Sequence, residues 1–270
     1  MTKFIVLSLF PEIFKPYINS SIIKRAIDKK LIDIELINIR DFANNKNNKV
    51  DDTPYGGGSG MVMMCKPLDL SIKYVIDKLN TINYRLIYMS PKGKLLNYEL
   101  VSGFSKSVEN YILICGHYEG IDERIIKKYN IEQISIGDYV LTGGELPAMV
   151  LIDTISRLKP GVLSDGSLSE ESHTNVLLEY DQYTKPSNYD GMKVPDVLCS
   201  GNFKLIDQYR RKSAIYTTYK NRPDLLRKAL KLNIISKDEV KDAKIINKND
   251  KKKGKWKYNG YNKTNRARKF

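Results

Sequence analysis

The sequence predicts an α/β domain with a mostly parallel sheet, followed by a small all-helical domain. Three observations support this fold class. Short apolar runs alternate with helix-period segments through about the first 160 residues, as expected of strands joined by crossover helices. The run from Tyr111 to Cys115 is apolar throughout, which is typical of a parallel strand buried on both faces. Beyond Pro195, helix-period patterns follow one another without a strand-like run between them.

The first domain should begin with a buried strand and continue with alternating helices and strands. Ser20 and Ser21 can cap a helix, and Pro67 is tolerated in a first helical turn. Residues 90–93, Ser-Pro-Lys-Gly, are expected to form a turn. The expected strands span residues 4–10, 32–39, 85–89 and 111–115, and the expected helices span residues 22–30, 67–79 and 99–108.

A glycine-rich stretch follows the strand at 111–115. A shorter apolar run passes through Gly137 to Gly143 and Gly144. Glu145 and Pro147 then fit the start of a helix that continues with apolar residues to about residue 153.

The chain divides into four predicted segments. These are an α/β domain at 1–160, a flexible interdomain linker at 161–187, a helical domain at 188–247 and a basic, disordered tail at 248–270. The helical domain is expected to contain helices at 203–219, 223–232 and 236–244. The tail is rich in Lys and Asn and too polar to form a core.

The charge of the chain favours an anionic partner. Lys and Arg number 45 against 31 Asp and Glu, a net charge of +14, which fits nucleic acid or a membrane surface. The tail carries +9 of this charge, with ten Lys or Arg and one Asp, so charge alone is a weak argument for RNA binding by the body of the chain.

Cysteine usage and the N-terminus indicate a compartment. The three cysteines are far apart and form no C-x-x-C pair, so neither a disulfide framework nor a zinc site is expected. Pro11 and Glu12 interrupt the N-terminal apolar run, and no segment is apolar for long enough to span a bilayer. We therefore expect a cytoplasmic protein with no membrane partner.

Glycines gather where two neighbouring strands are expected to end. Gly116, Gly120, Gly143 and Gly144 would allow backbone groups to approach a flat ligand closely, and open α/β sheets bind ligands at that edge. The chain has neither a phosphate-binding P-loop nor a strand-linked G-x-G-x-x-G. These glycines indicate either an adenine-type ligand held by backbone groups or ordinary strand-to-helix turns.

Four motifs carry a resemblance to one known family. They are VDDTPYGGGSGM (50–61), GHYEGIDER (116–124), SIGDYVLTGGELPA (135–148) and SRLKPGVL (156–163). In this order they resemble the bacterial tRNA (guanine-N1)-methyltransferase family, the TrmD family of S-adenosylmethionine-dependent SPOUT enzymes. The resemblance covers roughly residues 1–235. It implies methylation of guanine N1 in tRNA at position 37, immediately 3′ of the anticodon.

The resemblance also implies a fold detail, partners and a cofactor. It implies a deep trefoil knot, which pattern alone would not justify because knots are very rare. It implies an obligate homodimer in which the linker of one chain closes the site of the other, and it implies binding of the tRNA anticodon arm. Magnesium is implied as a promoter. The cofactor-binding residues implied by the match are Tyr88, Met89, Ser90, Pro91, Gly116, Gly120, Ser135, Ile136, Gly137, Tyr139, Leu141, Gly143, Gly144 and Pro147.

Methylation of guanine N1 needs a base for its proton and a positive charge near O6. By resemblance, Arg157 is the cation at O6, although a helix-end cation without a catalytic role would also occupy that position. Relatives usually carry Asp-Ser in the linker as the base, and this chain has Glu171-Ser172 with one residue fewer before it. Glu171 is therefore the predicted base and Glu170 is its rival.

Three further residues match substrate-side positions of the family. They are Asp52, Glu119 and Ser172. By resemblance, Glu119 and Asp122 both match family positions that line the guanine and cofactor region. An ion pair or a carboxylate at a helix start explains each of them equally well.

Two other functions compete with methyl transfer. A nicotinamide-dependent oxidoreductase would need a glycine fingerprint after the first strand, where Phe10-Pro11-Glu12 stands instead. A non-catalytic RNA-binding protein could use the basic tail and the Tyr-rich helices. No nucleophilic serine motif accompanies His117 or His173.

Overall fold

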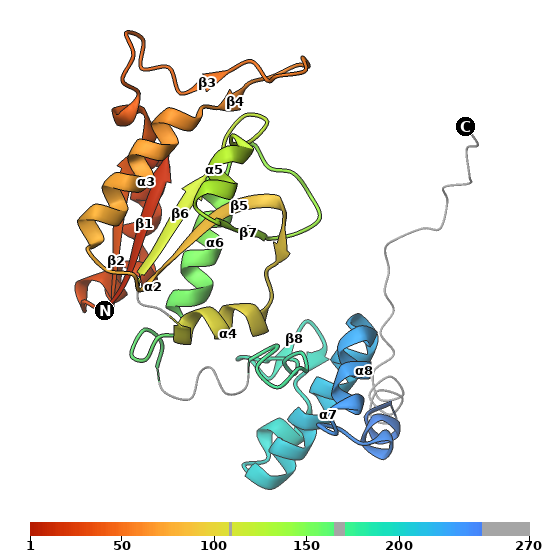
Figure 1. The fold of residues 1–270 in the computed structure, drawn as a ribbon. Coiled ribbons are helices and arrows are strands. Elements are labelled where there is room, and N and C mark those ends of the chain that lie inside the picture. Colours follow the sequence, from red (N-terminus) through yellow and green to blue (C-terminus); the bar gives the residue numbers. More distant parts are fainter. Residues whose placement is uncertain (108–109, 165–170, 245–270) are drawn as a thin grey trace. The chain divides into compact units, whose positions relative to one another are not determined.

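The computed structural model describes residues 1–107, 110–164 and 171–244. Glu170 and the predicted disordered tail lie outside these residues. The chain forms two compact units, Met1–Leu168 and Ser169–Phe270, and each is described by itself (Figure 1).

The first unit is built on a five-stranded parallel sheet. Its strand order is β2-β1-β6-β5-β7, and every pair in it is parallel. The strands are β1 (Thr2–Ser8), β2 (Ile32–Asn38), β5 (Tyr84–Leu95), β6 (Asn110–Cys115) and β7 (Glu132–Ser135). The predicted α/β class with a mostly parallel sheet is confirmed, and β6, the run that suggested it, is the central strand.

Helices cover both faces of this sheet because its strands are apolar on both sides. Along β1, Phe4 and Val6 belong to one buried cluster, and Ile5 and Leu7 belong to the other. Full burial of such side chains stabilises the fold by about 1.5–3 kcal/mol each. The first cluster packs against α1 (Phe14–Ile18), α2 (Ser21–Asp28), α4 (Tyr98–Ser107) and α6 (Glu145–Ser156), and the second packs against η2 (Ile39–Phe42), α3 (Cys65–Leu79) and α5 (Glu123–Lys128).

The predicted turn at 90–93 is wrong. These residues continue β5, which runs to Leu95 and pairs with β7 on both sides of a register shift between Met89 and Lys94. Gly93 makes this possible, because a Cβ there would lie 2.3 Å from the backbone of Gln133 and Ile134. The prediction failed because a Ser-Pro-Lys-Gly sequence is typical of a turn, whereas the strand is extended by a contact with a segment distant in sequence.

A short antiparallel ribbon lies at the end of the sheet (Figure 1). It consists of β3 (Asp51–Asp52) and β4 (Val62–Met63). The remaining short element of the first unit is the 3-10 helix η1 (Pro11–Ile13), which follows β1.

The second unit contains a helical core and a small hairpin. Its elements are β8 (Asn188–Tyr189), β9 (Met192–Lys193), η3 (Asp196–Cys199), α7 (Phe203–Asn221) and α8 (Pro223–Lys231), and residues 237–244 are also helical. Pro223 is the first residue of α8, where its missing N–H costs nothing. Leu177, Ile215 and Leu226 are buried together in its core.

Candidate cofactor pocket

The part of β5 beside its register shift and the loops that follow β6 and β7 line one pocket of the first unit. Parallel strands place their carboxyl ends at one edge of the sheet, so segments far apart in sequence meet there. All fourteen predicted cofactor-binding residues line it: Tyr88, Met89, Ser90, Pro91, Gly116, Gly120, Ser135, Ile136, Gly137, Tyr139, Leu141, Gly143, Gly144 and Pro147. Their role in binding a cofactor stays a prediction.

The glycines of this pocket are required by packing within the protein. A Cβ on Gly116 would lie 2.6 Å from the Tyr88 ring, and one on Gly144 would lie 2.7 Å from the Cα of Cys115. The two turns are also joined directly, since Gly144 N–H donates to the Gly116 carbonyl at 2.9 Å. Gly120 has a φ of +123°, which L-residues rarely adopt. The glycine turns therefore form one closely packed backbone wall.

The other walls suit a flat, uncharged group. Ile136, Leu141 and Pro147 are apolar, and burial raises the pKa of Tyr88, so its phenol stays neutral. Ser135 Oγ both donates to the Gly137 carbonyl and accepts from the Gly137 N–H, which fixes the turn after β7. An adenine-type ligand held by backbone groups fits such a cradle.

The β3–β4 ribbon is hydrogen-bonded to one wall of the pocket. Met63 N–H donates to the Gly120 carbonyl at 2.9 Å, and Glu119 N–H donates to the Met61 carbonyl at 3.0 Å. Glu119 lies at the exposed rim and lines the pocket. Gly60 packs against its side chain, because a Cβ there would lie 2.6 Å from Glu119 Oε1. The ribbon thus orients the predicted substrate-side carboxylate.

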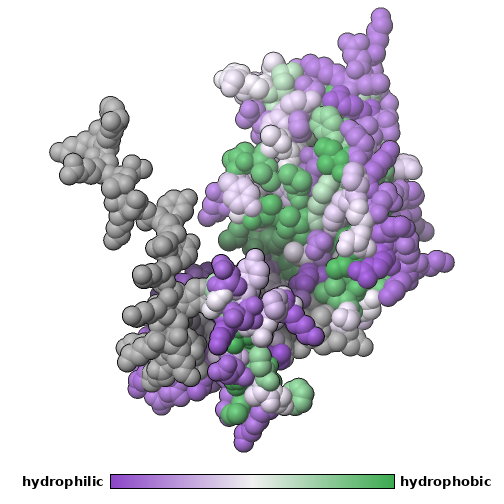
Figure 2. All heavy atoms as spheres, turned by 180° about the vertical axis from the view of Figure 1, so that it is seen from behind, coloured by the Kyte–Doolittle hydropathy of each residue, from purple (hydrophilic) through white to green (hydrophobic). Residues whose placement is uncertain are grey.

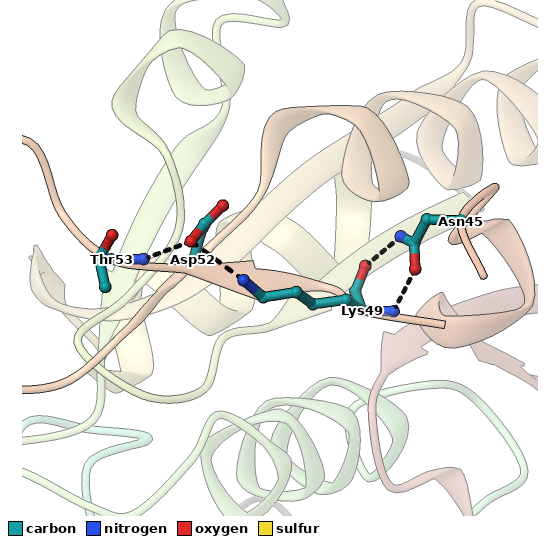
Figure 3. A network of polar contacts seen from close by, with 4 residues as sticks. All are labelled: Asn45, Lys49, Asp52 and Thr53. Carbon is teal, nitrogen blue, oxygen red and sulfur yellow. Dashed lines mark hydrogen bonds and ion pairs between the residues drawn. The ribbon is translucent and has the colours of Figure 1, made fainter. Parts of the chain in front are cut away.

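Asp52 lies on this ribbon, outside the residues that line the pocket. It accepts from Lys49 Nζ at 3.0 Å and from Thr53 N–H at 2.9 Å (Figure 3). Lys49, and then Thr53, hold the pKa of this exposed carboxyl below its usual range. Asn45 fixes the backbone of Lys49 by accepting from its N–H and donating to its carbonyl. Asp52 is therefore ionised and already paired, and its contact with substrate stays a prediction.

Asp122 serves the structure of α5. Its carboxylate accepts from the N–H of Arg124 at 2.9 Å and pairs with the Arg124 guanidinium at 2.8 Å. This guanidinium holds the pKa of Asp122 well below its usual range. The two structural alternatives considered for this residue, a helix-start carboxylate and an ion pair, are both confirmed.

The predicted catalytic residues are divided between the two units. Arg157 ends α6 and is half-buried in the first unit. Glu171 and Ser172 belong to the second unit, where Ser172 Oγ accepts from Glu179 N–H at 2.9 Å. The roles of Arg157, Glu171 and Ser172 stay predictions, and Glu170 lies outside the described residues.

Comparison with known proteins decides the family. The profile described as "tRNA (Guanine-1)-methyltransferase TrmD" matches residues 2–228. The chain belongs to this tRNA (Guanine-1)-methyltransferase TrmD family. A protein of Ruminiclostridium cellulolyticum named tRNA (guanine-N(1)-)-methyltransferase is 53% identical over 234 residues, covering 86% of this chain and 100% of the relative. Proteins of the same name from Clostridioides difficile and Malacoplasma penetrans are 52% and 50% identical, covering 84% and 86% of this chain and 98% and 100% of those relatives.

Sequence reasoning missed several residues that line the pocket of this TrmD-family chain. They are His117, Tyr118, Ile134, Val140 and Thr142. All five lie within or beside the motifs that carry the resemblance. Their position in the sequence was therefore the signal that could have identified them as pocket residues. In the described part of the chain, no helix has the length and apolar character needed to cross a membrane.

Proposed function

We propose that this TrmD-family protein transfers a methyl group from S-adenosylmethionine to N1 of guanine in tRNA, at position 37, immediately 3′ of the anticodon. One observation carries the proposal. The fourteen residues predicted to bind the cofactor, which lie in three separate stretches of sequence, converge on one pocket. The names of the relatives support the reaction and its substrate.

The chain has candidates for each chemical role. The bound cofactor would supply an activated methyl group. Glu171 would accept the proton of guanine N1 and Arg157 would hold the charge that gathers on O6, so both act mainly in the transition state. Glu119, fixed at the rim of the pocket by the ribbon, would contact the guanine together with Asp52 and Ser172.

We propose that the site is completed by a second copy of the chain, with the linker of one subunit closing the pocket of the other. Apolar side chains remain exposed on α6 and in the loop before it, among them Val140, Leu146 and Val150. Figure 2 shows hydrophobic residues gathered on one face of the first unit. Contiguous exposed apolar surface is typical of interfaces, which supports a homodimer.

We also propose the trefoil knot implied by the resemblance. Two close backbone approaches support it. Gly93 packs on the backbone of Gln133 and Ile134, and Gly144 packs on that of Cys115. Glycine is typical of sites where another backbone approaches this closely, and such packing between segments far apart in sequence supports the knot.

The second unit would bind the tRNA anticodon arm. Basic side chains are frequent on α7, and one of them, Arg210, lies over the Tyr180 ring with its Cζ 4.9 Å from the centroid. Lys244 lies over the Tyr219 ring in the same way. Cations and aromatic rings together suit RNA. A tRNA substrate also agrees with a cytoplasmic location.

No cage for magnesium is evident in the described part of the chain. Within residues 1–107, 110–164 and 171–244, no group of three or more His, Cys, Asp or Glu could hold a metal ion. We assign no step to magnesium.

The decisive experiment is methylation of an unmodified tRNA transcript that carries guanosine at position 37. Methyl incorporation from labelled S-adenosylmethionine should appear as 1-methylguanosine in nuclease digests. A matched transcript with adenosine at position 37 should stay unlabelled. Equal labelling of both transcripts would refute the proposed position, and labelling of neither would refute the activity.

A further inference from the structure

The segment that carries the predicted base is attached to α7 in the second unit. Leu178 N–H donates to Thr218 Oγ1 at 2.8 Å. Further along the chain, Asp181 N–H donates to Ser213 Oγ at 3.1 Å. Both hydroxyl groups belong to α7. Glu171 closely precedes these two amides in sequence, so the part of the expected linker that follows it is hydrogen-bonded to a helix of its own unit.

Thr218 is a buried polar residue whose hydroxyl group has a partner on each side. Its side chain is 0% exposed. The hydroxyl donates to the Ala214 carbonyl, one helical turn earlier, at 2.7 Å. Its oxygen therefore presents a lone pair to the Leu178 N–H, from which it accepts. An amide shielded from water needs such an acceptor, and an apolar side chain at position 218 would leave it without one.

A compact loop connects Glu171 to the amide that Thr218 holds. His173 N–H donates to the Leu177 carbonyl at 2.9 Å. Thr174 N–H donates to the Glu171 carbonyl at 3.3 Å. We call residues 171–178 the Glu171 loop. Because its backbone is hydrogen-bonded within itself, a shift at its end next to α7 is passed on to Glu171.

The Glu171 loop contains a strained residue. Val176 has a φ of +68°, which a β-branched residue rarely adopts. Such a conformation persists only where the surrounding structure fixes it. Two contacts with α7 do so here, the burial of Leu177 in one core with Ile215 and the hydrogen bond from Leu178 to Thr218. Loss of that hydrogen bond should therefore let the loop relax into another conformation.

We propose that Thr218 is a positioning residue, which fixes the Glu171 loop to α7 and thereby sets the place of the Glu171 carboxylate during methyl transfer. Thr218 is fully buried, so it acts through Leu178 and the loop and not by contact with RNA or cofactor. The inference rests on the proposed function, which makes Glu171 the base. Misplacement of a reacting group by about 1 Å can lower a rate about 100-fold, so a loop of this kind needs a firm attachment.

The first test is the rate of the chemical step. Thr218→Val keeps the shape of the side chain and removes its hydroxyl group. Single-turnover methylation at saturating tRNA and S-adenosylmethionine should slow on the order of tenfold to a hundredfold. Affinities for S-adenosylhomocysteine and for tRNA should stay at their wild-type values, because position 218 is buried. Thr218→Ser keeps the hydroxyl group and should retain the wild-type rate.

The second test is amide hydrogen exchange in the protein without ligands. The Leu178 amide should be protected in the wild type, because it is hydrogen-bonded to a buried side chain. In Thr218→Val, amides of residues 173–178 should exchange faster, and those of α8 should not change. This measurement needs no methyl transfer. Absence of methylation in the wild type would therefore refute the proposed function, and the attachment of the loop would still be tested.

Controls separate positioning from stability. Ser236 Oγ accepts from Glu239 N–H at 3.1 Å and caps the helical segment at 237–244 of the same unit. Ser236→Ala should lower the stability of this unit and leave the rate and the exchange of the Glu171 loop unchanged. Ser213→Ala removes the second attachment and should also slow methylation, which provides a second variant if Thr218→Val fails to fold.

Three outcomes would overturn the inference. The first is an unprotected Leu178 amide in the wild type, which would show that the loop is not attached in solution. The second is a wild-type rate in Thr218→Val, or in Ser213→Ala where only that variant folds. The third is equal slowing in Thr218→Val and Ser236→Ala, which would assign the effect to the stability of the unit.

Discussion

The contact between Gly144 and the end of β6 can be tested by adding one methyl group. In Gly144→Ala, the new Cβ would lie 2.7 Å from Cys115 Cα and 2.9 Å from Gly116 N. β6 cannot move away because β1 and β5 pair with it on both sides. Overpacking of this kind costs about 1–3 kcal/mol. Separation of the two turns would also weaken the bond from Gly144 N–H to the Gly116 carbonyl, at about 1 kcal/mol.

Gly103→Ala is the matched control for this prediction. Gly103 lies on the exposed face of α4 with no atom within 4 Å of the position of a Cβ, so alanine there should stabilise the protein by about 0.5–1 kcal/mol. Denaturant unfolding should therefore show Gly144→Ala less stable by about 2–4 kcal/mol and Gly103→Ala slightly more stable. Calorimetric titration with S-adenosylhomocysteine should show weakened binding in Gly144→Ala alone. Wild-type stability and affinity in Gly144→Ala would refute the close-packing argument.

Four further predictions concern catalysis, RNA binding and acid stability. Glu171→Gln should retain cofactor affinity and lose methyl transfer by orders of magnitude in single-turnover assays; full activity in that variant would remove Glu171 as the base and favour Glu170. Arg157→Ala should lower the single-turnover rate strongly with small changes in ligand affinity. A lowered melting temperature with a near-normal rate would instead show that Arg157 acts as a helix-end cation without a catalytic role. Removal of residues 248–270 deletes +9 of charge and should make tRNA binding less salt-dependent with an unchanged rate at saturation; an unchanged salt slope would contradict RNA contact by the tail. Burial opposes ionisation of Asp69, but hydrogen bonds from Lys128 and others outweigh it and hold the pKa of Asp69 well below its usual range. The free energy of unfolding should therefore fall as pH drops below about 4. If Asp69→Asn lost stability in acid as steeply as the wild type, this prediction would be contradicted.

The parallel sheet could be predicted because each of its strands has a local sequence pattern that indicates it. Residues 111–115 are apolar without interruption and end at Gly116, and a run so short beside a glycine favours a buried strand over a helix. The extension of β5 past Met89 could not be predicted in this way. It depends on the contact of Gly93 with the backbone of Gln133 and Ile134, which no local pattern contains.

The candidate site shows the same division. Its glycine turns and the residues beside them were identified from motifs, and they line one pocket. Ser8 and Glu145, which form a buried hydrogen bond, were not identified, because 137 residues separate them in sequence and each alone is an ordinary residue for its position. Asp122 could be interpreted in several ways until Arg124 was seen beside it.

The ribbon of β3 and β4 also determines which side of the pocket can open. Its strands contain two residues each, and the Gly56–Gly58 loop between them is exposed. The opposite walls continue from β5 and β6, whose buried amides should exchange with solvent only on global unfolding. Amides of the ribbon and of residues 117–120 should exchange through much smaller, local openings. Separation of the ribbon would therefore free the pocket wall at residues 117–120, to which it is hydrogen-bonded, at a fraction of the free energy needed to unfold the domain.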